Sequence, residues 1–113
     1  MRRGFLIAGL GSALTILPAG AWADAIDGHW CWQTRHMQIE GSMIVTPAGK
    51  RTTGDYTRHA FSYVVPPAET DAGQTVSMTL INENVVHLWI GAAGTARAGR
   101  EPQVWLRCAA PST

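Results

Sequence analysis

Apolar and polar residues alternate along much of the chain, which is the pattern of half-buried β-strands. In MQIEGSMIVT the apolar residues Met37, Ile39, Met43 and Val45 alternate with polar ones. Gly41 stands in the middle of this stretch, where a glycine indicates a bulge or bend. The pattern therefore predicts one bent strand over residues 37–46.

Further strands follow the same rule. TVSMTLINENVVHLWI predicts a hairpin over residues 75–90, turning at 82–84. DYTRHAFSYVV predicts one strand over 55–65, stopped by Pro66, and EPQVWLRC predicts the last strand. The glycine- and alanine-rich stretch 91–99 predicts a flexible loop. No stretch has the periodicity of a long amphipathic helix. The sequence predicts an all-β domain of about six to eight strands, a small antiparallel barrel, with a β-sandwich as the alternative.

The first residues differ in pattern from the rest. Arg2 and Arg3 precede an apolar stretch over 5–17, and Ala21-Trp22-Ala23 has the small residues of a cleavage site. This predicts a bacterial signal peptide over 1–23, cleaved after Ala23, and a single β-barrel domain over 24–113. RRGFL fits a twin-arginine signal, and an ordinary secretory signal fits as well. We expect a periplasmic or secreted protein with no stable membrane anchor after cleavage.

Charge and cysteine content narrow the possibilities further. Seven of the nine Lys and Arg residues and all eight Asp and Glu follow Ala23, and no basic cluster larger than Lys50-Arg51 occurs. Nucleic acid is therefore not an expected partner. The two cysteines, Cys31 and Cys108, lie near opposite ends of the domain, and an even number in an exported chain predicts a disulfide.

The cysteines also predict which strands are neighbours. Side chains alternate across a strand, so Trp30 and Trp32 share one face and Cys31 has the other. On the last strand Trp105 and Arg107 share a face. A disulfide would place the first strand beside the last, as in a closed barrel without exposed edges. We therefore expect Trp30, Trp32, Trp105 and Arg107 to belong to the structural core.

Gly28-His29-Trp30 resembles the Gly-x-Trp motif on the first strand of the calycins, which include lipocalins, avidins and small secreted bacterial protease inhibitors. The resemblance implies that Arg107, from the last strand, packs across Trp30 at the closed end of a barrel. By analogy with the inhibitors, residues 24–27 would be a peptide that inserts into a partner.

The sequence contains few residues in patterns that would bind a metal or catalyse a reaction. The histidines His29, His36, His59 and His87 have no metal-binding spacing, and neither a metal site nor a cofactor is predicted. No catalytic motif or acid–base pair occurs, so no catalytic residue is predicted. His59 lies two and four residues before the aromatic residues Phe61 and Tyr63, so all three would face the same side of one strand. These three are expected to point inward as possible binding residues.

These observations predict an exported, non-enzymatic binding module. Its expected partner is an unknown protein, as for a protease or hydrolase inhibitor, or a small apolar ligand. Because tryptophans and methionines are expected to fill a barrel of this size, protein contact is favoured over a large cavity. The alternative is a structural or accessory protein of the cell envelope. A small enzyme or a redox accessory protein is the less favoured class.

Overall fold

The computed structural model describes residues 25–97 and 99–109. The signal peptide that the sequence predicts over residues 1–23 lies outside the described residues. The described part contains nine strands and no helix, and hence no helix able to cross a membrane. The strands are β1 (Gly28–Trp32), β2 (Arg35–Glu40), β3 (Met43–Val45), β4 (Arg51–Thr53), β5 (Asp55–Thr57), β6 (Ala60–Val64), β7 (Thr75–Asn82), β8 (Val85–Gly91) and β9 (Gln103–Arg107).

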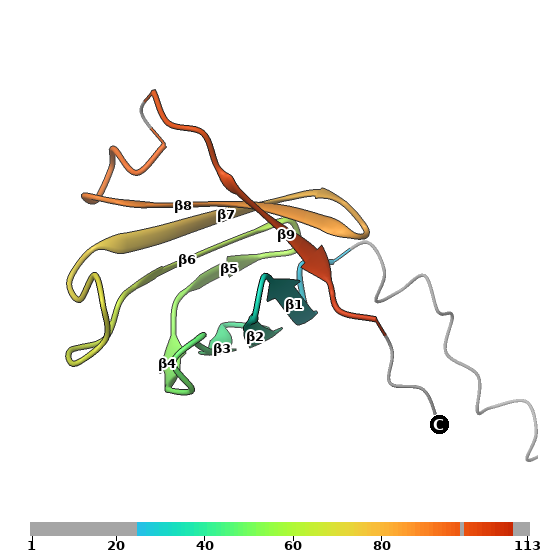
Figure 1. The fold of residues 1–113 in the computed structure, drawn as a ribbon, viewed down its shortest axis with the longest axis horizontal. Coiled ribbons are helices and arrows are strands. Elements are labelled where there is room, and N and C mark those ends of the chain that lie inside the picture. Colours follow the sequence, from blue (N-terminus) through green and yellow to red (C-terminus); the bar gives the residue numbers. More distant parts are fainter. Residues whose placement is uncertain (1–24, 98, 110–113) are drawn as a thin grey trace, which may run out of the picture.

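All nine strands form one sheet in the order β4-β3-β2-β1-β9-β8-β7-β6-β5, and every paired strand is antiparallel to its neighbour. Strands that follow one another in the chain pair with each other, except β4 and β5. The first strand, β1, also pairs with the last, β9, and Trp30 lies opposite Arg107. Figure 1 shows the sheet curling around a common interior. The protein is a nearly closed antiparallel barrel, as the sequence predicts.

The two outermost strands of the sheet, β4 and β5, are separated in the chain by Gly54 alone. A Cβ atom at Gly54 would lie 2.2 Å from the backbone oxygen of Ser62 on β6, so the chain crosses β6 where no side chain fits. A closed barrel in which every strand is antiparallel to both of its neighbours needs an even number of strands. We therefore interpret β4 and β5 as the two halves of one bent strand, so that the nine strand segments act as eight strands around the barrel.

Two stretches that the sequence predicts as single strands form hairpins in the structure. The stretch predicted as one bent strand over 37–46 turns at Gly41 and Ser42, so that Glu40 pairs with Met43. The turn moves Ile44, which interrupts the alternation in the sequence, to the interior, where it is fully buried. The stretch predicted as one strand over 55–65 turns in the same way at Arg58 and His59.

Two further strand predictions are confirmed. The hairpin over 75–90 is confirmed by the pairing of β7 with β8, and the last strand is β9. The inward-facing side chains form one continuous core around two fully buried tryptophans, Trp30 and Trp105. Other members of this core are Ile26, Met37, Ile39, Ile44, Phe61, Tyr63, Val65, Val76, Met78, Val86 and Leu88.

The up-and-down connections give the barrel two different ends. At one, the closed end, lie residues 25–27, Arg107 and the short turns at 41–42, 58–59 and 83–84. At the other, the open end, lie the turn at 33–34 and the longer loops over 46–50, 65–74 and 92–102. In Figure 1 the described chain enters and leaves on the side of β1 and β9, away from the longer loops.

Candidate functional site

The closed end is sealed by a tryptophan and an arginine from the strands that close the barrel. The guanidinium of Arg107 lies 4.4 Å from the ring centroid of Trp30, and the indole nitrogen of Trp30 donates to the backbone oxygen of Ile26 at 2.8 Å. Arg107 also donates to the backbone oxygens of Ala25, Asp27 and Glu83, at 3.0, 2.8 and 2.7 Å. Burial lowers the pKa of Arg107, and the charges of Glu83 and Asp27 act in the opposite direction.

Gly28 is required at this end for two reasons. Its φ is 122°, a conformation that other residues rarely adopt, and a Cβ there would lie 2.6 Å from Nη1 of Arg107. The glycine of the Gly-x-Trp motif therefore makes space for the arginine to reach the ring of Trp30.

The segment before β1 is part of the same seal. Ile26 is fully buried, and the carboxylate of Asp27 accepts hydrogen bonds from the backbone nitrogen of Gly41, at 2.8 Å, and from the hydroxyl of Tyr56. The hydrogen bond to Asp27 raises the pKa of Tyr56. Residues 25–27, expected by analogy to insert into a partner, are instead built into the barrel, and Asp24 lies outside the described residues.

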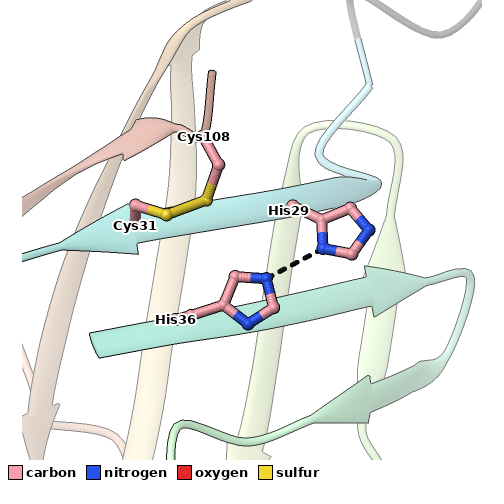
Figure 2. Close-up of a disulfide and its surroundings, with 4 residues drawn as sticks. All are labelled: His29, Cys31, His36 and Cys108. Carbon is pink, nitrogen blue, oxygen red and sulfur yellow. Dashed lines mark hydrogen bonds between the residues drawn. A yellow bond between two sulfur atoms is a disulfide. The ribbon is translucent and has the colours of Figure 1, made fainter. Parts of the chain in front are cut away.

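The predicted disulfide between Cys31 and Cys108 is present, with a sequence separation of 77 and its Cα atoms 5.2 Å apart. It joins β1 to the residue that follows β9 (Figure 2). Beside it, the backbone nitrogen of Cys108 donates to the backbone oxygen of His29 at 3.0 Å. The covalent link thus fixes the pairing that closes the barrel.

The open end contains a pocket of about 210 Å³, here called the open-end pocket. Six side chains that face the interior line it: Tyr63, Val65, Val76, Leu88, Ile90 and Trp105. Polar side chains from the loops and strand ends surround its mouth: Arg35, Glu69, Thr70, Asp71 and Gln103. The pocket therefore combines an apolar floor with a polar rim, the usual composition of a small-molecule site.

Tyr63 is the polar group of the pocket floor. Only 6% of its surface is exposed, and in the described part of the chain no hydrogen-bond partner faces its hydroxyl. Burial, followed by the negative charge of Glu69, raises the pKa of Tyr63 to about 12, and the positive charge of Arg35 opposes this shift. The hydroxyl is therefore protonated at neutral pH and can donate a hydrogen bond.

The rim is ordered by its own hydrogen bonds. The hydroxyl of Thr46 donates to Glu69 at 2.8 Å and accepts from the backbone nitrogen of Lys50 at 3.2 Å, which ties the two loops together. On the opposite side, the indole nitrogen of Trp105 donates to the side-chain oxygen of Gln103 at 2.9 Å. The polar groups of Thr46 and Trp105 therefore have partners, in contrast to the hydroxyl of Tyr63.

The structure separates the residues that the sequence grouped as possible binding residues. Phe61 and Tyr63 are buried in the core, and Tyr63 lines the open-end pocket. The prediction that His59 points inward is wrong: it is exposed in the β5–β6 turn at the closed end. The parity argument fails there because the turn interrupts the alternation.

Among the residues expected in the core, Trp30 and Trp105 are fully buried. Trp32 is partly buried, with its ring centroid 5.7 Å from that of Trp105, and Arg107 is partly exposed over Trp30. Sequence reasoning missed the pocket residues Val65, Val76, Leu88, Ile90 and Gln103. The inward alternation of β7 and β8 could have indicated three of them. Gln103 and Val65 lie two residues from Trp105 and Tyr63, so alternation could have indicated them as well.

A second cluster of reactive groups lies on the outer surface, next to the disulfide. Nδ1 of His29 on β1 lies 2.8 Å from Nε2 of His36 on β2, and one of the two nitrogens donates to the other (Figure 2). The two rings meet edge to edge through these nitrogens, with centroids 5.0 Å apart and planes at 16°. Both side chains are exposed.

In the described part of the chain, no three His, Cys, Asp or Glu side chains gather in a way that could hold a metal ion. No protein-family model matches the chain, and no similar protein was found among curated proteins or solved structures. By its fold and its site, the protein is a small antiparallel barrel that is sealed at one end and has a pocket at the other.

Proposed function

We propose that the protein is a non-enzymatic binding module whose open-end pocket holds a small uncharged molecule with an apolar body and one hydrogen-bond acceptor. The observation that carries this proposal is the Tyr63 hydroxyl, which is buried at the pocket without a partner in the described part of the chain. Leaving a buried polar group unpaired costs about 1–3 kcal/mol. A ligand that accepts a hydrogen bond from Tyr63 would remove this cost.

The volume of the pocket limits the size of the ligand. At about 210 Å³ it is smaller than the pockets of roughly 300–1,000 Å³ that hold drug-sized molecules. An engineered apolar cavity of about 150 Å³ binds benzene. The ligand class is therefore a single aromatic ring or a short branched chain carrying a carbonyl, ether or ester oxygen.

Charges at the rim favour an uncharged ligand. Arg35 and Asp71 are exposed, so water screens them, and Glu69 already accepts the hydrogen bond of Thr46. The floor itself contains no charged side chain. A charged ligand would lose its hydration on entering and would meet no opposite charge at the floor.

The closed end supports a relation to the calycins as part of the same proposal. Gly28, Trp30 and Arg107 pack as the resemblance implies, and the strand directions form an up-and-down barrel. Together with the N-terminal sequence, this favours a periplasmic or secreted binding protein. The inhibitor version has less support, because residues 25–27 are built into the closed end.

Two probes of nearly the same shape test the proposal. Acetophenone has a carbonyl oxygen where α-methylstyrene has a methylene group, so only acetophenone can accept a hydrogen bond. We expect both to bind the wild-type protein in isothermal titration calorimetry, and acetophenone to bind more tightly. Tyr63→Phe should weaken acetophenone binding about 5- to 10-fold, since a net hydrogen bond contributes about 1 kcal/mol. Binding of α-methylstyrene should be unchanged.

Tyr56→Phe is the matched control, because Tyr56 is exposed at the opposite end. It should leave the affinity for both probes unchanged. Binding of neither probe to the wild-type protein at millimolar concentration would contradict the proposed pocket. Equal loss of affinity in Tyr63→Phe and Tyr56→Phe would contradict the assigned role of Tyr63.

A further inference from the structure

We propose that His29 and His36 form a binding site for a divalent transition metal on the outer surface of the barrel, with Cu²⁺ as the preferred ion. This site is independent of the open-end pocket, since neither histidine lines that pocket. The inference rests on the distance between the two ring nitrogens, on their exposure and on the rigid strands that hold them.

The β1–β2 hairpin brings the two histidines to one face. His29 pairs with Gln38 and Cys31 pairs with His36, so His29 and His36 are diagonal neighbours on the face that also contains Cys31. Diagonal neighbours across antiparallel strands are close enough for long side chains to meet. Figure 2 shows the two rings reaching toward each other beside the disulfide.

The distance between the nitrogens matches one coordination geometry. Bonds of about 2.0 Å from a metal to two imidazole nitrogens that are 2.8 Å apart subtend an angle of about 90° at the metal. This is the angle between adjacent ligands in square-planar or octahedral complexes, which Cu²⁺ and Ni²⁺ adopt with nitrogen ligands. A tetrahedral ion such as Zn²⁺ would need the nitrogens about 3.3 Å apart at the same bond length.

Binding requires a rotation of both rings and a rearrangement of protons. In the hydrogen-bonded pair each nitrogen points at the other, so each ring must turn by about 45° for the two lone pairs to converge on one ion. One ring nitrogen now donates a hydrogen bond to the other. When a metal enters, the donating ring moves its proton to its second nitrogen, so that a lone pair of each ring faces the ion and neither ring loses its proton overall. The two remaining positions of a square-planar ion are open to water or to an outside ligand.

The strands beneath the pair are held rigidly. β1 pairs with β2 through five residues, from Gly28 opposite Ile39 to Trp32 opposite Arg35. On its other side β1 is linked to the end of β9 by the disulfide and by the hydrogen bond from Cys108 to the His29 backbone oxygen. Such preorganisation lowers the entropic cost of holding two ligands on one ion. The order of divalent affinities then favours Cu²⁺ over Ni²⁺ and Zn²⁺.

The test uses the untagged full-length protein, because a histidine tag would bind the same ions. Cu²⁺ is titrated in a buffer containing glycine as a weak competitor, and binding is followed by calorimetry and by electron paramagnetic resonance. We expect one tight Cu²⁺ site with hyperfine structure from two imidazole nitrogens. His29→Ala and His36→Ala should each weaken binding at least 10-fold, and the double variant should lose the two-nitrogen spectrum.

His59→Ala and His87→Ala are the matched controls, since they remove single histidines elsewhere on the barrel. They should leave the affinity and the spectrum unchanged. Wild-type binding no tighter than that of the double variant would overturn the proposal, as would equal losses in the control variants. Tighter binding of Zn²⁺ than of Cu²⁺ would overturn the geometric argument.

Discussion

The two ends of the barrel use similar residues in opposite ways. At the closed end the aromatic ring of Trp30 is covered by Arg107, and the polar groups of this pair bond to backbone oxygens. At the open end the rings of Tyr63 and Trp105 line a pocket, and the Tyr63 hydroxyl has no partner within residues 25–97 and 99–109. Arg35, a cation at the rim of this pocket, is exposed. Arg97, in the loop over 92–102, does lie over a ring, 4.6 Å from that of Trp89, but neither residue lines the pocket.

This difference shows how a barrel of this size can provide both stability and a site. A domain this small has only a modest margin of stability. The stabilising devices, a disulfide, an arginine stack and a buried N-terminal segment, are concentrated at or near the closed end. The open end can then keep an unpaired polar group without unfolding the protein. Changes at the closed end should therefore affect stability, and changes at the open end should affect binding.

The largest effect is expected from the disulfide. Replacing both Cys31 and Cys108 by serine should lower the free energy of unfolding by about 4 kcal/mol, because the link closes a long loop in the unfolded chain. Urea unfolding of the wild type and of the double variant measures this difference. A loss below about 1 kcal/mol would mean that the closed end is stable without its covalent link.

Arg107→Ala should lower the free energy of unfolding by about 2–4 kcal/mol, since it removes the stack on Trp30 and leaves backbone oxygens of the N-terminal segment without a donor. Arg35→Ala, the matched change at the open end, should alter it by less than about 0.5 kcal/mol. The same urea experiment compares them. Equal effects of the two substitutions would remove the proposed distinction between the ends.

Tyr63 should make stability depend on pH in the alkaline range. Its pKa in the folded state is about 12, above the ordinary value of 10.0, so folding favours the protonated form. The associated stability is complete below pH 10 and is lost as the pH rises toward 12, by about 2–3 kcal/mol. Unfolding curves between pH 8 and 12 should show this loss in the wild type and not in Tyr63→Phe. Parallel curves for the two proteins would contradict the burial of the hydroxyl.

Gly28→Ala should cost about 2 kcal/mol, because it combines an unfavourable backbone conformation with a clash against Arg107. Gly49→Ala is the control: Gly49 also has a positive φ, of 89°, but a Cβ there meets no atom within 4 Å. It should cost about 1 kcal/mol. The difference in melting temperature between the two variants measures the effect of the clash with Arg107. Equal melting temperatures would contradict a close contact between Gly28 and Arg107.

Long-range pairing was predictable where two independent signals agreed. The parity of Trp30 and Cys31, together with the single pair of cysteines, placed β1 beside β9, and the disulfide confirms it. The hairpin of β7 and β8 was predictable because a polar turn separates two alternating stretches. The two-residue turns at Gly41-Ser42 and Arg58-His59 were missed, because such short turns leave the alternation looking nearly continuous.

One of these turns explains a wrong prediction about the site, and other features explain what was missed. His59 was expected inside because the alternation was carried through the turn, and it is exposed. The contact of His29 with His36 depends on the register of the β1–β2 hairpin, which spacing along the chain does not reveal. The open-end pocket depends on loops over 46–50 and 65–74, whose conformations are set by hydrogen bonds such as that from Thr46 to Glu69.

The indole N–H signals of the tryptophans in a two-dimensional NMR spectrum test the central claim most directly. Trp30 reports on the closed end through its bond to Ile26, and Trp105 reports on the open end through its bond to Gln103. With signals assigned from single Trp→Phe variants, titration with acetophenone should shift the Trp105 signal in a saturable way and leave the Trp30 signal in place. A Trp105 signal that stays fixed, or one that moves no more than that of Trp30, would contradict a barrel with one sealed and one binding end.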